Sequence, residues 1–126
     1  MLRYAPFMEH DGEVTIGIEG REAHVVVRIG KTVIADTTEA CVLQETGHAG
    51  RYYLPAKDVR FDLLHESPTV THCPHKGDAT HLSATIDGEV IEDVAWVYED
   101  PIPQAEGIRG YVAFYDDKTR TDISAL

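Results

Sequence analysis

The sequence predicts an all-β, mainly antiparallel domain with two small sheets in a sandwich or partly open barrel, and at most one or two short helical turns. Three observations support this prediction. Apolar and polar residues alternate with a period of two, Gly-containing turn signals separate the alternating stretches, and no stretch has the period of a long helix. About seven short strands are expected within a single domain over residues 1–126.

The first predicted hairpin covers residues 24–36. In AHVVVRIG, Val25, Val27 and Ile29 fall on one face of an extended chain, which is typical of a half-buried strand. Gly30 begins a two-residue turn before TVIADT. Such a turn suits a hairpin because Gly adopts positive φ at little cost.

The stretch ACVLQET continues the alternation and predicts a further strand. Its pattern places Cys41, Leu43 and Glu45 on one face. GYVAFY predicts a late strand, and LPAKDVRFDLL predicts one helical turn that leads into an extended segment. Residues 1–20 and 118–126 are polar ends that we expect to lie outside the core.

A second hairpin is predicted over residues 81–98. The alternating stretches HLSATI and EVIEDVAWVY flank Asp87 and Gly88. An Asp-Gly pair between two such stretches favours a type I′ turn, whose twist matches that of the strands.

Composition excludes several classes of partner. The 126 residues include 11 Lys and Arg against 22 Asp and Glu, a formal charge of −11, so we expect neither nucleic acid nor a membrane surface as a partner. No signal peptide or apolar run of about 18 residues occurs, and the two cysteines form no Cys-x-x-Cys pair. We therefore expect a soluble, cytoplasmic protein with reduced thiols, and leave its oligomeric state open.

The stretch TVTHCPHKGDA, residues 69–79, concentrates titratable side chains around one Pro and one Gly. His72, Cys73 and Asp78 are candidate catalytic residues. His72 is the best candidate to carry a proton, because histidine is the side chain suited to that role, and Cys73 is a candidate nucleophile because basic residues lie nearby in the sequence. Asp78 is a candidate to orient Lys76 or His72.

Five residues are candidates for ligand binding. Lys76 is a candidate to receive an anionic group, and Tyr53 and Tyr98 combine a large ring with a hydroxyl. Glu45 and Arg60 add a carboxylate and a guanidinium. We predict that His72, Lys76 and Asp78 line one cavity with Glu45 or Tyr53, which would give a small anionic molecule its site.

No metal and no cofactor are predicted. Cys73 and His75 share a face in an extended chain, but a closed zinc site needs two more ligands. The remaining candidates, which are scattered along the chain, are Cys41, His65, His72 and His81.

These residues also admit structural interpretations. Cys73 suits a partly buried thiol, Lys76 and Asp78 a surface pair at a turn, and Glu45 and Arg60 a solvated ion pair. Three functions stay open: binding of a small, possibly anionic molecule around the turn, an enzyme that uses His72 and Cys73, and a protein-interaction module. We slightly prefer binding without catalysis.

Several stretches resemble one known family. VIADT, ETGH followed by YYLP, DVRFDLL, THCPHKGDA, AWVYEDP and GYVAFY occur in the order and spacing of the DUF427 family, over about residues 24–116. The resemblance implies a small β-rich domain similar to the β-tent folds, in which two antiparallel sheets meet like the sides of a tent. It implies no established reaction.

Two features usual in proteins of this kind are missing from the sequence. The label nucleotidyltransferase that DUF427 members carry calls for Gly-Ser to hold a triphosphate and paired acidic residues to hold Mg²⁺; neither Gly-Ser nor Asp-x-Asp occurs. Better-known β-tent proteins hold a structural zinc with paired Cys-x-x-Cys motifs, and two cysteines cannot supply four thiolates. We therefore expect the fold to rest on hydrophobic packing.

Overall fold

The computed structural model describes residues 14–126, and all strand pairing in this range is antiparallel. The predicted all-β class is therefore confirmed. The strands are β1 (Ile16–Gly20), β2 (Ala23–Ile29), β3 (Thr32–Thr37), β4 (Cys41–Glu45), β5 (Arg51–Tyr53), β6 (Leu64–Cys73), β7 (Gly77–Ile86), β8 (Glu89–Val97), β9 (Val112–Phe114) and β10 (Arg120–Ala125). The short 3-10 helices are η2 (Ala56–Asp58), η3 (Phe61–Leu63) and η4 (Pro103–Ile108).

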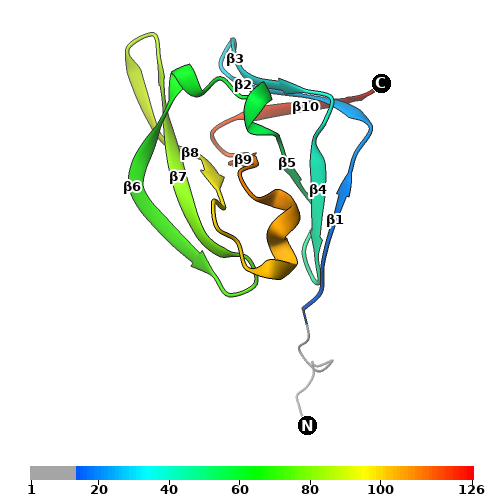
Figure 1. Cartoon of the computed structure of the whole chain (residues 1–126). Helices are drawn as coiled ribbons and strands as arrows, with labels where there is room; N and C mark the ends of the chain where they lie inside the picture. The colour runs from blue at the N-terminus through cyan, green and yellow to red at the C-terminus, as the bar shows by residue number, and fades with distance from the viewer. Residues whose placement is uncertain (1–13) are drawn as a thin grey trace.

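The strands of the described range form three sheets. Their strand orders are β1–β4–β5, β10–β2–β3 and β6–β7–β8–β9. In Figure 1 the four-stranded sheet forms one wall and β1–β4–β5 the opposite wall, with η4 between them, while β10–β2–β3 lies at the upper end of the view. The sequence predicts two sheets, and the division into three follows from the pairing of β2 with the C-terminal strand.

Both predicted hairpins are present. The β2–β3 turn contains Gly30 at φ 59°, and Val25 and Val27 are buried on one face of β2. The β7–β8 turn places Asp87 and Gly88 at φ 52° and 81°. Positive φ at both central residues is the signature of the type I′ turn that the Asp-Gly pair predicts.

The chain between β5 and β6 and the ends of the described range differ from the prediction. Two 3-10 turns precede β6, where the sequence predicts one helical turn. The ends of the described range add two strands that the sequence does not predict: β1 pairs with β4 and β10 pairs with β2 along their full lengths, and neither strand contains a buried residue. Residues 1–13 lie outside the described range.

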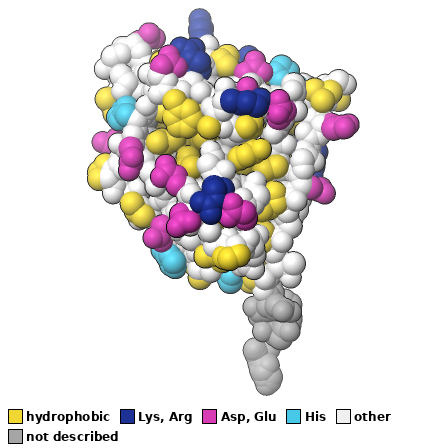
Figure 2. All heavy atoms as spheres, viewed as in Figure 1, with side chains coloured by type: hydrophobic (Ala, Val, Ile, Leu, Met, Phe, Trp, Pro, Cys, Tyr) yellow, Lys and Arg dark blue, Asp and Glu magenta, His cyan; other side chains and the backbone are white. Residues whose placement is uncertain are grey.

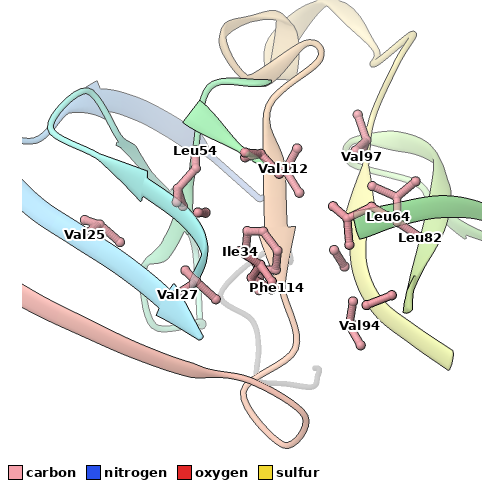
Figure 3. Close-up of a cluster of buried hydrophobic side chains, with 14 of the residues drawn as sticks. Val25, Val27, Ile34, Leu54, Leu64, Leu82, Val94, Val97, Val112 and Phe114 are labelled. Atoms are coloured by element: carbon pink, nitrogen blue, oxygen red, sulfur yellow. The ribbon is translucent and has the colours of Figure 1, made fainter. Parts of the chain in front are cut away.

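The main core lies where β2 and β3 face the four-stranded sheet β6–β7–β8–β9 (Figure 3). Most of its side chains come from the β10–β2–β3 and β6–β7–β8–β9 sheets, and Leu54 directly follows β5. Figure 3 labels Val25, Val27, Ile34, Leu54, Leu64, Leu82, Val94, Val97, Val112 and Phe114. Burial of such side chains contributes about 1.5 to 3 kcal/mol each, so apolar packing dominates the stability of the fold.

A second, smaller core cluster lies between β4–β5 and the β7–β9 wall, beside η4. It contains Cys41, Leu43, Tyr53, Ala79, Tyr98, Ala105, Ile108 and Ala113. This cluster matters for function because it forms the floor of a cavity that opens between the two walls.

Candidate functional site

A cavity of about 290 Å³ lies between β4–β5 and the four-stranded sheet. Its walls come from both sides: Leu43, Glu45, His48, Ala49, Arg51, Tyr53, Thr71, Lys76, Trp96, Tyr98 and Tyr115. Four of the five predicted ligand-binding residues, namely Glu45, Tyr53, Lys76 and Tyr98, therefore meet in one place.

Alternation along β4 brings Glu45 to the cavity. Cys41 and Leu43 are buried on the inward face of the strand, and Glu45 continues that face at its end. The side chain of Glu45 is only 13% exposed. The predicted face of β4 is thus confirmed, and it places a carboxylate in the wall of the cavity.

The β6–β7 turn holds Lys76 on the opposite side. The Lys76 N–H donates to the Cys73 carbonyl at 3.1 Å, and the Ile102 N–H donates to the Lys76 carbonyl at 2.9 Å. Gly77 follows at φ 118°, where a Cβ would lie 3.4 Å from the Asp100 carbonyl oxygen. A glycine is needed there because the backbone conformation strains other residues. The turn is anchored on both strands and on the segment before η4.

Lys76 and Glu45 form an ion pair across the cavity wall. Lys76 Nζ donates to Glu45 Oε1 at 2.6 Å, and the side chains are 12% and 13% exposed. Burial pushes the pKa of Glu45 upward, but the hydrogen bond and charge of Lys76 outweigh it, so the net shift is downward. For Lys76, burial lowers the pKa, but the interactions with Glu45 and Cys73 together outweigh it, so the net shift is upward. Both groups stay charged at neutral pH.

Aromatic side chains form much of the remaining wall. Trp96 Nε1 donates to the Tyr53 hydroxyl at 3.3 Å, and the two rings meet edge to face. The centres of the Tyr115 and Trp96 rings are 4.5 Å apart. Burial raises the pKa of Tyr53 and of Tyr98, which keeps both phenols neutral.

Arg51 closes one end of the cavity. Its Nη1 donates to the Phe114 carbonyl and to Asp116, each at 3.2 Å. Its guanidinium carbon also lies 5.2 Å from the centre of the Trp96 ring, which is a cation–π contact. Arg51 is therefore a cation held against the aromatic wall.

The structure does not place His72 and Asp78 in this cavity. His72 and Asp78 are opposite each other in the β6–β7 register and bond at 2.7 Å, with side chains 70% and 72% exposed. The single cavity that the sequence predicts is corrected here: Lys76 lies in the cavity, while the His72–Asp78 pair lies on the outer face. Cys73 packs instead against the small core cluster.

Arg60 also lies apart from the cavity. It precedes η3 and forms two hydrogen bonds with Asp62, at 2.9 and 2.7 Å. Both side chains are more than half exposed. The predicted pairing of Arg60 with Glu45 is therefore corrected, because Glu45 pairs with Lys76.

A family model described as "Domain of unknown function (DUF427)" matches residues 17–124. The chain belongs to the DUF427 family. The match runs from the beginning of β1 to near the end of β10, beyond the stretch of resemblance recognised in the sequence. No curated protein matches the chain.

In this DUF427 chain, the wall residues that the predicted ligand set omits include one arginine and two large aromatic side chains. They are Arg51, Trp96 and Tyr115. The period-two rule could have found Arg51, since it lies two residues before Tyr53 on the same strand. The sequence around Tyr115 has no comparable signal. Tyr115 follows β9, and it lines the cavity because tertiary packing places the end of β9 there.

The predicted metal candidates of the DUF427 chain do not converge. Among residues 14–126, no group of three or more His, Cys, Asp or Glu side chains is arranged to hold a metal ion. Cys41 is buried in the small core, His65 bonds to Thr85, and His81 is buried with Nε2 at 2.8 Å from the Tyr115 hydroxyl.

We predict that EDTA leaves the melting temperature of the DUF427 protein unchanged, because its stability rests on apolar packing. Differential scanning calorimetry with and without chelator measures this. A metal ion that purifies with the protein in stoichiometric amount, with unfolding on its removal, would contradict the prediction.

Figure 2 shows acidic side chains spread over the visible face, with the fewer basic side chains beside them. Within the described residues, no helix has the length and apolarity needed to cross a membrane.

Proposed function

We propose that this DUF427 protein binds a small, planar, polar molecule in the cavity between its two walls, without catalysing a reaction. The observation that carries the proposal is the Glu45–Lys76 ion pair, which lies at the wall of a cavity lined by four aromatic rings. An ion pair withdrawn from water costs desolvation free energy, and replacing it by apolar residues often stabilises a protein. A role in ligand recognition would explain why the chain keeps a pair that costs free energy to bury.

The pair offers a donor and an acceptor side by side. Lys76 donates one N–H to Glu45 Oε1 and also interacts with the Cys73 side chain, which leaves at least one further N–H of Lys76 and the Oε2 atom of Glu45 to face a ligand. The edge of a cyclic amide or imide is complementary, because its N–H donates to a carboxylate while its adjacent C=O accepts from an ammonium group. A heterocycle with such an edge is the ligand class we assign.

The remaining walls suit a flat ring. Tyr53, Trp96, Tyr98 and Tyr115 provide apolar ring surface, and the two buried phenols remain neutral. A cavity of about 290 Å³ is at the small end of the range for ligand pockets, which fits one or two fused rings. Aromatic contacts of this kind contribute about 0.5 to 1.5 kcal/mol beyond the burial of area.

The other two functions lack a supporting observation. A catalytic pair of His72 and Cys73 would need both groups at one substrate, yet His72 is exposed with Asp78 while Cys73 packs against the small core. An interaction module would show a broad apolar patch. The large exposed apolar side chains of the described residues are dispersed over different elements: Phe61, Val70, Val90, Ile123 and Leu126.

Fluorescence of Trp96 tests the proposal, since Trp96 is the one tryptophan of the sequence and lines the cavity. We expect 1-methyluracil to change the emission and to bind at least about tenfold more tightly than 1,3-dimethyluracil, which lacks the N–H that faces Glu45.

Two matched carboxylate-to-amide variants serve as test and control. Glu45→Gln should weaken binding of 1-methyluracil about tenfold, while Asp78→Asn on the outer face should leave it unchanged. Equal binding of the two uracils, or a loss confined to Asp78→Asn, would contradict the proposal.

A further inference from the structure

A second cavity of about 540 Å³ adjoins the first and shares part of its wall. Its lining mixes apolar and polar residues from β2, β5, β9, β10 and the segments that flank β5 and β9: Val27, His48, Ala49, Gly50, Arg51, Tyr52, Leu54, Phe114, Asp116, Thr121 and Ile123. His48, Ala49 and Arg51 line both cavities. Arg51 is the charged side chain common to the two.

Arg51 lies beside the point where the backbone pairing between β5 and β9 ends. Leu54 and Val112 exchange both backbone hydrogen bonds, each at 2.8 Å, as in an antiparallel ladder. Toward Arg51 the ladder does not continue, and the Phe114 carbonyl accepts from the Arg51 guanidinium instead. The Arg51 side chain thus reaches β9 beside this point, and it lines both cavities.

The Arg51 guanidinium retains hydrogen-bonding capacity. Both of its bonds to described residues use Nη1, so the N–H groups of Nη2 and Nε are open to a ligand. Its acidic partner Asp116 is 74% exposed, and an ion pair so exposed contributes little to stability. A ligand anion would therefore displace Asp116 at small cost.

The charge balance of the walls limits that anion to one negative charge. The walls of the two cavities carry Glu45 and Asp116 against Lys76 and Arg51, which sums to zero with His48 neutral. Displacing Asp116 leaves one positive charge in excess. A monocarboxylate matches this excess, whereas a phosphate dianion would also meet the field of a protein with a formal charge of −11.

We propose that the two cavities form one site for an elongated ligand, whose planar head binds at Glu45 and Lys76 and whose carboxylate arm binds Arg51 and extends into the second cavity. This inference rests on the proposed function and adds the chemistry of the second half of the ligand. It also reassigns the anion-binding role that the sequence suggests for Lys76. The charge of Lys76 is offset by Glu45, so Arg51 is the group that recognises the anion.

The test uses 1-(3-carboxypropyl)uracil and its neutral methyl ester as probes. Binding is followed by Trp96 fluorescence and by amide chemical shifts of Thr121 and Ile123, which line only the second cavity. We expect the acid to bind at least about tenfold more tightly than the ester, because a charge-assisted hydrogen bond exceeds a neutral one. The acid should also shift the Thr121 and Ile123 amides.

Two variants move this preference in opposite directions. Arg51→Met keeps an apolar stem against Trp96 and should abolish the preference for the acid, with folding checked by the dispersion of amide signals. Asp116→Asn removes the competing carboxylate and should strengthen binding of the acid about twofold to threefold, with the ester unaffected.

The outcomes separate this inference from the proposed function. Acid and ester that bind equally well to the natural protein, or a preference that survives Arg51→Met, would overturn the inference while leaving the planar-head site intact. Failure of both probes and of 1-methyluracil to bind would overturn the two proposals together.

Discussion

Replacing Lys76 by Met is expected to lower the free energy of unfolding by about 2 to 4 kcal/mol at pH 7. Met keeps most of the volume of the lysine stem but leaves the Glu45 carboxylate, only 13% exposed, without its cation. Removing one partner of a fully buried pair costs about 3 to 5 kcal/mol, and the slight exposure here reduces that value. Urea unfolding at neutral pH measures the loss.

The sequence leads to a different expectation for this substitution, since a lysine in a turn contributes little to a core. The structure corrects that view because Lys76 is 12% exposed and paired. Lys57→Met is the matched control. Lys57 bonds to Glu39 at 2.8 Å with both side chains more than half exposed, so its loss should cost less than about 1 kcal/mol.

The cost of Lys76→Met should depend on pH and on Glu45. In the natural protein the pKa of Glu45 lies below its ordinary value of 4.5, so its ionisation stabilises the fold above pH 4.5, and this contribution is lost as the pH falls through the folded-state pKa. In Lys76→Met only burial acts strongly on Glu45, which raises its pKa, so protonation relieves the defect in acid.

Stability measured from pH 7 down to pH 4 and the double variant Glu45→Gln/Lys76→Met check this explanation. The difference in free energy of unfolding between the natural protein and Lys76→Met should become smaller in acid. At pH 7 the double variant should recover much of the stability that Lys76→Met loses. If the difference in free energy of unfolding did not change with pH, and if the effects of Glu45→Gln and Lys76→Met were strictly additive, the two charges would not interact.

Leu54→Ala should lower the free energy of unfolding by about 3 kcal/mol. Leu54 is 2% exposed in the main core, and its backbone forms the link between the β1–β4–β5 sheet and β9. Leucine-to-alanine changes in cores cost about 2 to 5 kcal/mol, because apolar contacts are lost and a void remains. Urea unfolding monitored by Trp96 fluorescence measures the loss.

Leu126→Ala provides the matched control for that measurement. The same atoms are removed, but Leu126 is 71% exposed, so the change should be within about 0.5 kcal/mol. Equal effects of the two substitutions would contradict the assignment of Leu54 to the core. Leu54 also adjoins Tyr53, so partial unfolding there should perturb the cavity first.

Local sequence signals predict the hairpins because both halves of each hairpin are neighbours along the chain. Gly30 and the Asp87–Gly88 pair set the turns, and alternation then sets which face is buried. Pairing between distant strands has no such signal. Ile16 pairs with Glu45 and Thr121 with Val27, and these registers are decided by tertiary packing.

The candidate site was partly predictable for a related reason. Glu45 follows from the alternation of β4, and Lys76 was singled out by its turn. The cluster around Lys76 is close in sequence, but two paired strands send alternate side chains to opposite faces. His72 and Asp78 therefore face outward together, and Cys73 faces the core. Proximity in sequence alone could not separate these two sets.

A map of amide chemical shifts during titration with 1-methyluracil tests the central claim, that the cavity between the two walls is the binding site. We predict shifts concentrated in residues 43–53, at Lys76 and at Trp96, all of which line or adjoin the cavity. The outward-facing pair of His72 and Asp78 should show smaller shifts. Shifts centred on that outer pair, or spread over elements remote from the cavity, would contradict the claim.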